Sequence, residues 1–401
     1  MKKFRKWLRD RGAANGRLLL AVLLAATLLS YALGSLVDGL SDREFSFIES
    51  SSSAHALVAD PRFAPLKLLE WATGFLPDLT PQIMRLPSIV FAAMTLAALV
   101  YVLRRWYGPR TATFGFIVFV CSAWFLHVGR LATADVMYLW SIPALLVSHI
   151  ILRNHNGSKL AFLSWIVISA LLLYVPGLIW FVLLNAAWLW RDLAQTWQNF
   201  RLQTKILMVM AFLIILTPLG YSLAIDFAPV RLLDLAGLPH DLPQPLDVLR
   251  HIGEGLAFIS VYGQAPTDIW LNHLPLLDAM LSGAFLTGIY FYAQHWQASR
   301  TRLITSFIAL GLILYGLGVV PLSVVVVLLY LIVAAGIAYI LYLWMSVFPR
   351  NPIARKFGMF VVIIAVGFSC LYNLRQYFVA WPHHPDTGSS FSEREIPRSK
   401  I

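Results

Sequence analysis

The stretch LSVVVVLLYLIVAAGIAYILYLWMS, residues 322–346, decides the fold because it holds no charged side chain over its whole length. About 20 consecutive apolar residues in a helix cross the hydrocarbon core of a bilayer. The stretch therefore predicts a membrane-spanning helix. The rest of the 401-residue chain agrees, since 59% of its residues are hydrophobic and only 13% are charged. Soluble domains carry about 25% charged residues, so the composition excludes a water-soluble core.

Apolar runs of spanning length recur on both sides of this stretch. One run of about thirty residues is broken by a Pro-Gly pair at 176–177, and a second break lies at 318–321. Such breaks favour turns between separate helices. The sequence thus predicts an all-α membrane protein with about eleven transmembrane helices. The runs are 17–36, 86–103, 112–128, 136–152, 160–190 as two helices, 206–225, 276–295, 303–319, 322–346 and 357–373.

The connections divide the chain into four parts. An N-terminal transmembrane module, 1–225, includes a first outer loop at 37–85, in which the amphipathic stretch 65–71 predicts helices lying along the membrane surface. A second outer loop follows at 226–275, then C-terminal transmembrane helices at 276–373 and an outer tail at 374–401. We expect the polar tail to be partly disordered beyond Pro385.

The distribution of charge predicts the orientation. With the N-terminus inside, the short cytoplasmic connections hold 20 of the 31 Lys and Arg residues but only two of the 20 acids. Basic residues concentrate on the cytoplasmic side of membrane proteins. We therefore predict a multi-pass protein of the plasma (inner) membrane, with a cytoplasmic N-terminus, a retained signal anchor and an outer C-terminus. The same explanation accounts for the net charge of +11 without a nucleic-acid partner.

Three acids lie where predicted helices meet the outer water. Asp42 and Glu44 follow the first apolar run, and Asp135 stands in a short connection between two others. A carboxylate at such a boundary is costly to desolvate unless it faces a cavity or a partner. Converging in one cleft, these acids could deprotonate a hydroxyl, so we predict all three as catalytic. The alternatives are solvated loop acids, and a helix-capping Asp135 paired with Arg130.

Basic residues on the same side supply charges for a phosphate. Arg62, Lys67, Arg85 and Arg130 are the candidates. Arg holds phosphate oxygens through two parallel hydrogen bonds, whereas Lys acts as a point charge. Both cysteines lie inside apolar runs, and the histidines lack ligand spacing. The sequence therefore predicts substrate-binding bases and no metal site.

Several short segments occur in an order that resembles a known family. They follow one apolar run and a loop that opens with acids. The segments are APLK at 64–67, MRLPS at 84–88, RRWYG at 104–108, WFLHVGRLATAD at 124–135 and NHLPLLD at 272–278. This pattern resembles the glycosyltransferase C superfamily, in the branch of bacterial enzymes related to protein O-mannosyltransferases and aminoarabinose transferases.

The resemblance implies a specific chemistry. It implies a polyprenyl-phosphate-sugar donor, an inverting transfer outside the membrane, and a first-loop acid as general base. It also implies that Asp135 supports the site and that Asn272 belongs to the substrate-binding segment. Arg43 separates Asp42 from Glu44, acids that are often adjacent in the family, and the base stays open between them. Some relatives hold a divalent metal and others do not, so the cofactor stays open as well.

We therefore predict a membrane glycosyltransferase that moves a sugar from a polyprenyl-phosphate carrier to a hydroxyl of a protein, lipid or glycan. One rival is a transporter or lipid flippase that uses the same charges as a relay. Another is an inactive scaffold that binds lipid carriers or partner proteins. The absence of a Gly-rich phosphate loop argues against a nucleotide-driven pump.

Overall fold

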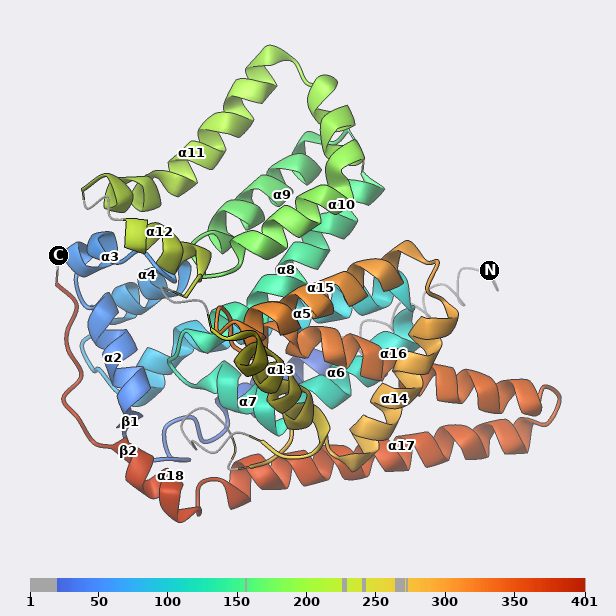
Figure 1. Cartoon of the computed structure of the whole chain (residues 1–401). Coiled ribbons are helices and arrows are strands. Elements are labelled where there is room, and N and C mark those ends of the chain that lie inside the picture. Colours follow the sequence, from blue (N-terminus) through green and yellow to red (C-terminus); the bar gives the residue numbers. More distant parts are fainter. Residues whose placement is uncertain are drawn as a thin grey trace, which may run out of the picture.

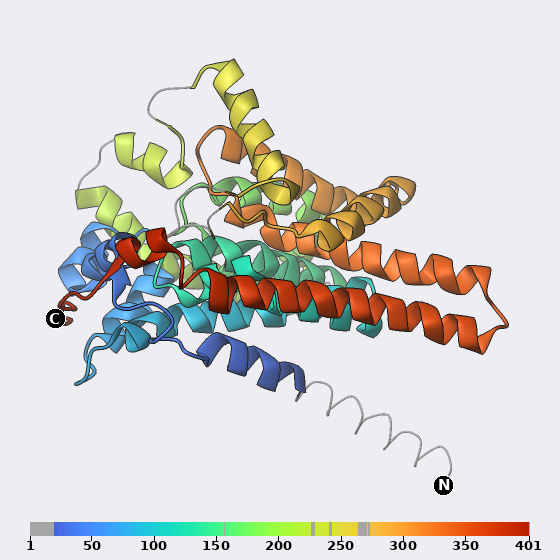
Figure 2. The same ribbon diagram turned by 90° about the horizontal axis from the view of Figure 1, so that it is seen from below.

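The computed structural model describes residues 20–155, 157–225, 229–239, 243–263, 271 and 273–400, and helices dominate it (Figures 1 and 2). A helix at Leu20–Ser30 comes first. The elements that follow are β1 (Leu40–Ser41), α2 (Asp42–Ser51), α3 (Ala54–Ala59), α4 (Ala64–Thr73), α5 (Pro81–Trp106), α6 (Pro109–Val120), α7 (Ala123–Arg130), α8 (Asp135–Asn154), α9 (Lys159–Leu172), α10 (Ile179–Gln198), α11 (Leu202–Ile225), α12 (Pro229–Ala236), α13 (Pro245–Ser260), α14 (Ala279–Gln294), α15 (Ser299–Gly316), α16 (Ser323–Val347), α17 (Pro352–Arg375), η1 (Gln376–Ala380), α18 (Pro385–Ser390) and β2 (Phe391–Ser392). The predicted all-α membrane class is confirmed.

Five of the described helices are long and apolar enough to cross a membrane, namely α5, α8, α11, α16 and α17 with its η1 extension. The α6–α7 pair makes a sixth if it counts as one span, although it bends by 66° at its break. The other predicted runs also form helices, some of them short, such as Leu20–Ser30 and Lys159–Leu172. Eleven crossings therefore remain a prediction.

Both predicted breaks are turns. Gly177 and Gly318 take left-handed φ values of +78° and +73°, which glycine adopts without strain. The two turns pack together, since a Cβ on Gly177 would lie 2.6 Å from Val320 and 2.8 Å from Val319. The Pro-Gly signal was thus correct: α9 and α10 are separate helices.

The core centres on α16, which is buried along most of its length. Small residues bring it close to α14: a Cβ on Gly336 would lie 1.9 Å from the carbonyl oxygen of Ala284, and one on Gly288 would lie 2.2 Å from that of Ile332. Membrane helices commonly associate through such small residues, because close backbones gain packing contacts. The stretch that predicts the fold is therefore also its packing centre.

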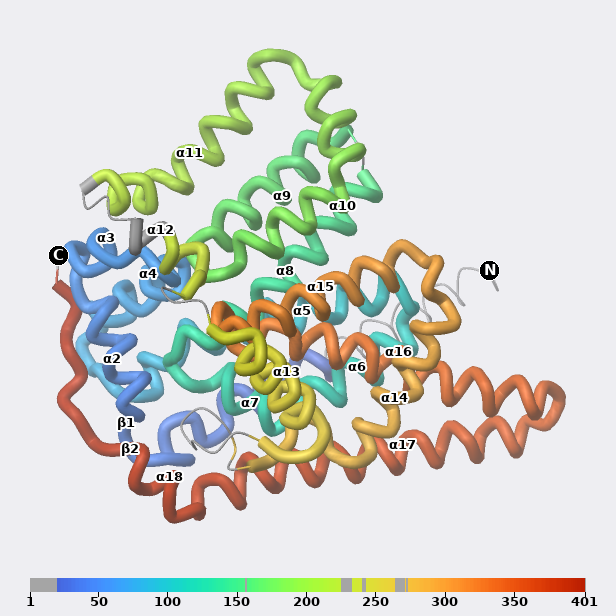
Figure 3. The backbone as a smooth tube through the Cα atoms, viewed as in Figure 1, coloured from blue at the N-terminus to red at the C-terminus, as the bar shows by residue number. Residues whose placement is uncertain are grey.

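The first loop and the C-terminal tail lie together at one end of the molecule (Figure 3). The first loop forms the helices α2, α3 and α4, and α4 covers the amphipathic stretch 65–71. Strand β2 pairs antiparallel with β1, and the Nε1 of Trp71 donates a 3.1 Å hydrogen bond to the carbonyl of Lys400. The expected disorder beyond Pro385 is wrong, because these contacts order the tail against the loop. The α16–α17 turn lies at the opposite end (Figure 1).

Candidate functional site

A cavity of about 390 Å³ opens at the end of the molecule formed by the first loop. The walls come from α2, the turn before α4, α4 itself and the turn before α8. Three predicted site residues, Arg62, Lys67 and Asp135, meet here. The full lining is Arg43, Ser46, Phe47, Ser50, Asp60, Arg62, Phe63, Lys67, Thr133, Ala134 and Asp135.

One carboxylate holds two of the cations in this cavity. The Nε of Arg62 donates to Oδ1 of Asp60 at 2.7 Å, and its Nη2 donates to Oδ2 at 3.2 Å. The Nζ of Lys67 donates to Oδ2 of Asp60 at 3.0 Å and to the Asp60 carbonyl at 3.1 Å. Local chain geometry supports this arrangement: Asp60 caps the C-terminal end of α3, and Phe63 takes a left-handed φ of +59° before α4 begins. We call Asp60, Arg62 and Lys67 the cavity cluster.

These contacts shift the pKa values of the three side chains in the cavity cluster. Burial raises the pKa of Asp60, but the hydrogen bonds and charges of Arg62 and Lys67 outweigh it, so the pKa lies below its usual value. Burial lowers the pKa of Lys67 despite the opposing charge of Asp60. The hydrogen bond to Asp60 raises the pKa of Arg62. Asp60 is therefore a stable anion and a poor proton acceptor.

A second ion pair lies on the other wall of the cavity. The Nη1 of Arg43 lies 3.9 Å from Oδ2 of Asp135, and the Asp135 side chain is 25% exposed. Arg43 comes from α2, whereas Asp135 is the first residue of α8. Two segments that are far apart in the sequence thus place opposite charges in the same cavity.

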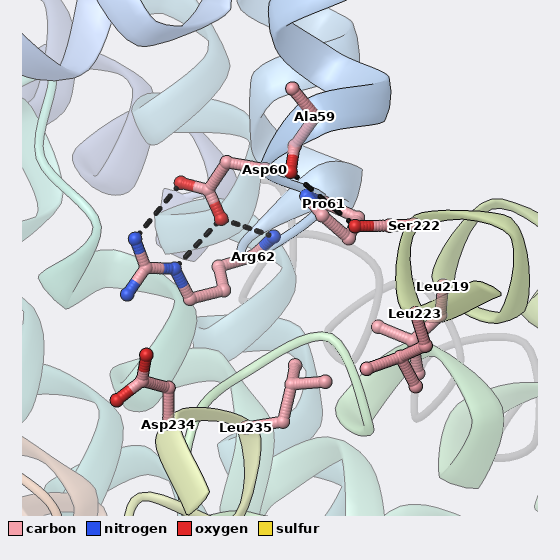
Figure 4. A pocket seen from close by; sticks show the side chains of 9 residues that line it. All are labelled: Ala59, Asp60, Pro61, Arg62, Leu219, Ser222, Leu223, Asp234 and Leu235. Carbon is pink, nitrogen blue, oxygen red and sulfur yellow. Dashed lines mark hydrogen bonds and ion pairs between the residues drawn. The ribbon is translucent and has the colours of Figure 1, made fainter. Parts of the chain in front are cut away.

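A smaller cavity of about 120 Å³ adjoins the cluster (Figure 4). Asp60 and Arg62 line both spaces, and here they face α11 and α12. Asp234 lies on the side of the Arg62 guanidinium away from Asp60, and its charge also raises the pKa of Arg62. Ser222 donates a hydrogen bond to the carbonyl of Ala59, at 3.3 Å. Arg62 is therefore the shared wall of the two spaces.

Glu44 lies outside this cavity and forms a buried ion pair with Arg85, which we call the dry pair. The Nε and Nη2 of Arg85 donate to its two oxygens at 2.8 and 2.9 Å. The backbone amides of Ala132 and Ser41 donate to the same oxygens at 2.9 and 3.1 Å. Ser41 and Glu44 also form a capping box at the start of α2. Both carboxylate oxygens are therefore occupied, and Glu44 ties α2 to α5 and to the turn before α8.

Asp42 is the more open first-loop acid. Its carboxylate accepts a hydrogen bond from Nη2 of Arg394 in the tail, and the side chain is 82% exposed. Asp42 directly precedes Arg43, which lines the cavity. It remains open to solvent at the start of α2.

Comparison with known proteins identifies the fold. No family model and no curated protein matches the chain. Among solved structures, ArnT from Cupriavidus metallidurans in its apo state superposes with a TM-score of 0.59 at 14% identity, covering 94% of this chain and 78% of that one. The same protein bound to undecaprenyl phosphate gives 0.52, with the same identity and coverage. The chain therefore shares the fold of ArnT.

Two of the predicted phosphate-binding bases are buried in structural contacts. Arg85 is buried against Glu44 and also donates to the carbonyls of Leu33 and Gly39 at 3.1 and 3.0 Å. Arg130 is buried, donates to the carbonyl of Tyr31, and lies 5.2 Å from the ring centroids of Tyr377 and Phe378. Neither residue lines the cavity, and Arg130 does not pair with Asp135.

Asn272 lies outside the described residues. Within the described ranges, no group of three His, Cys, Asp or Glu side chains is placed to bind a metal ion.

Sequence reasoning missed Asp60 and Arg43 as cavity residues. Asp60 lies two positions before Arg62, across a proline, so that the acid and the predicted base share one turn. That spacing is a readable signal. The capping-box pattern Ser-x-x-Glu at 41–44 is another, and it points to a structural Glu44. For Arg43 the sequence offers no comparable signal, since its partner Asp135 is distant in the chain.

Proposed function

We propose that this protein transfers a sugar from a polyprenyl-phosphate carrier to an acceptor hydroxyl at the outer face of the membrane, with inversion at the anomeric carbon. The observation that supports it most is the cavity, in which three cations meet two carboxylates. The fold adds support, because ArnT, which shares it, has been solved with undecaprenyl phosphate bound. The connections at one end of the helices are rich in Lys and Arg, whereas most of the acids lie at the other end. This distribution supports an orientation with the cavity on the outer side of the membrane.

The donor phosphate would bind at the cavity cluster. Arg62 presents a planar fork that matches phosphate oxygens, and Lys67 adds a point charge. Phosphate oxygens would take over hydrogen bonds that Asp60 now accepts. When the bond from the anomeric carbon to the phosphate oxygen breaks, the same cations stabilise the charge on the leaving lipid phosphate. Arg43 and Asp135 would lie across the sugar from this cluster.

The acceptor must lose a proton as its oxygen attacks the anomeric carbon. Glu44 is poorly suited to take it, because four donors already occupy its carboxylate. Asp42 is exposed, and its ion pair with Arg394 is at the surface. We therefore assign the general base to Asp42, and the support of the sugar and the acceptor to Asp135. Asp42 accepts the proton, the new glycosidic bond forms, and the lipid phosphate leaves.

The decisive experiment supplies the purified protein with a radiolabelled polyprenyl-phosphate sugar. We expect release of lipid phosphate and, with a competent acceptor, a labelled glycoside. Arg62→Gln should lower turnover by about 100-fold through loss of charge stabilisation at the phosphate, while the exposed Asp78→Asn should not. Gradient-coupled movement of an intact lipid-linked sugar or of a solute, without release of lipid phosphate, would instead establish a flippase or transporter. Binding without either activity would establish a scaffold.

A further inference from the structure

We propose that Asp60 is a charge counterweight: it leaves the cavity suited to the singly charged phosphodiester of the donor and unsuited to the doubly charged phosphomonoester of the product. This inference rests on the proposed function and deepens it. It assigns to Asp60 a role in releasing the product lipid phosphate. Asp60 would be a positioning residue, since it acts through Arg62 and Lys67 rather than on the reacting atoms.

The charges around the cavity nearly cancel. Three cations and two carboxylates line it, which leaves one positive charge. Asp60 contributes one of those carboxylates, and both of its oxygens are bound by the cations that would hold the phosphate. The titratable and charged groups in the lining are Arg43, Arg62, Lys67, Asp60 and Asp135. From outside it, Asp234 and Tyr138 act on Arg62, and Glu70 acts on Lys67.

The reaction changes the charge of the lipid it handles. A phosphodiester carries one negative charge at any physiological pH. A phosphomonoester has a second pKa near 6 and carries about −1.5 to −2 at pH 7. The donor therefore neutralises the cavity, whereas the product leaves it with an excess negative charge. In a half-buried space such an excess is costly.

Removing Asp60 alone would reverse this preference. In Asp60→Asn, the cavity gains one positive charge and then matches the monoester. Lys67 should stay in place, because it also donates to the backbone carbonyl of residue 60 at 3.1 Å. A merely structural ion pair makes a different prediction: its loss would weaken the binding of both lipids to the same extent.

The test uses two probes, farnesyl phosphate and its methyl ester, which differ by one methyl group and, above the second phosphate pKa near 6, by one charge. Their dissociation constants are measured on the full-length protein in detergent at pH 5.5 and pH 8. For wild type, the ratio of monoester to diester affinity should fall from pH 5.5 to pH 8, because the monoester gains its second negative charge over this range. For Asp60→Asn, the ratio should rise about tenfold or more at pH 8 and little at pH 5.5, a difference of about 1.4 kcal/mol. Asp60→Glu should restore the wild-type ratio.

The outcomes separate the inference from the function. The control Asp78→Asn removes an exposed acid outside the cavity and should leave the ratio unchanged. If lipid phosphate is released and both probes bind, but Asp60→Asn leaves their ratio at the wild-type value, the counterweight is refuted and the proposed function stands. If neither probe binds and no lipid phosphate is released, both are refuted. Should Asp60→Asn fail to fold, the wild-type protein still decides: a tenfold rise of its ratio from pH 5.5 to pH 8 contradicts the counterweight.

Discussion

Two of the carboxylate–arginine pairs formed by first-loop residues, Glu44–Arg85 and Asp60–Arg62, differ in what surrounds them. Glu44 and Arg85 are 0% and 2% exposed, and every oxygen of Glu44 already has two donors. Asp60 and Arg62 are 38% and 45% exposed and border two cavities. The same pairing therefore fixes helices at one place and keeps a binding space charged at the other. Burial of the pair, rather than residue type, separates structure from chemistry here.

The energetic contrast follows from desolvation. Removing one partner of a buried pair strands a charge and costs about 3–5 kcal/mol, whereas exposed pairs contribute about 0–1 kcal/mol. Removing one partner of the Glu44–Arg85 pair should therefore mainly lower the free energy of unfolding. Substitutions at the residues placed in the reaction, Asp42 and the cavity cluster, should mainly lower turnover.

The strongest test of this contrast is Asp42→Asn, because Asp42 is the first-loop acid outside the dry pair. We expect turnover of the lipid-linked sugar to fall by about 100- to 10,000-fold, the usual contribution of a positioned base. Thermal unfolding in detergent should be nearly unchanged, since the side chain is 82% exposed. Steady-state kinetics and a melting curve on the same preparation measure both.

Asp135→Asn is the matched comparison for that experiment. It keeps the shape of the side chain but removes the charge facing Arg43. If Asp135→Asn abolishes turnover while Asp42→Asn retains it, the general base is Asp135 and the assignment to Asp42 is wrong.

The next largest effect concerns the dry pair itself. Glu44→Gln should lower the free energy of unfolding by about 3–5 kcal/mol, because the Arg85 guanidinium loses its counter-ion in a buried site. Turnover per folded molecule should change much less than in Asp42→Asn. The double variant Glu44→Gln with Arg85→Met removes both charges and should recover part of the loss. If Glu44→Gln has normal stability but no turnover, Glu44 is a catalytic residue and not a structural one.

The fold was largely readable from the sequence, and the site only in part. Apolar runs such as 322–346 predict helices because a segment that crosses the hydrocarbon core as a helix must be about 20 residues long and predominantly apolar. Charge pairing carries no such pattern: Glu44 meets Arg85 and Arg43 meets Asp135 only after the chain folds. Arg85, Arg130, Arg62 and Lys67 look equivalent in sequence, yet of these four only Arg62 and Lys67 line the cavity, and Lys67 does so although it is as buried as Arg85 and Arg130.

The tail shows the same limit. Its polar composition is typical of a disordered end, but the antiparallel pair of β1 and β2 orders it. Sequence reasoning assigns no partner to two-residue strands, because their hydrogen bonds depend on a surface built by distant residues.

A smaller effect is expected at Glu70, a buried acid near the cavity cluster. Burial, together with the charge of Glu44, raises its pKa well above the usual 4.5, against the opposing hydrogen bond from Ser51 and the charge of Lys67. An acid with a raised native pKa contributes its full stability below the unfolded pKa and loses it as pH rises through the native value. Glu70→Gln stays neutral, so it should match wild type near pH 4 and exceed it by about 1 kcal/mol or more at pH 8.

Melting curves of Glu70→Gln from pH 4 to pH 9 measure this gain, with the exposed Glu49→Gln as control. A gain that is constant with pH, or one that Glu49→Gln reproduces, would contradict a neutral Glu70.

The smallest expected effect is at Arg394, whose ion pair with Asp42 joins the tail to the first loop. Arg394→Ala should change the free energy of unfolding by less than about 1 kcal/mol, because Asp42 is 82% exposed and water screens the pair. Strand β2 and the contacts of Lys400 remain to hold the tail. Deletion of residues 391–401 removes those contacts and should cost clearly more in the same melting experiment. An equal loss of stability in both variants would mean that the Asp42–Arg394 pair holds the tail to the first loop despite its exposure. The expected difference between the buried Glu44–Arg85 pair and the exposed ion pairs would then be wrong.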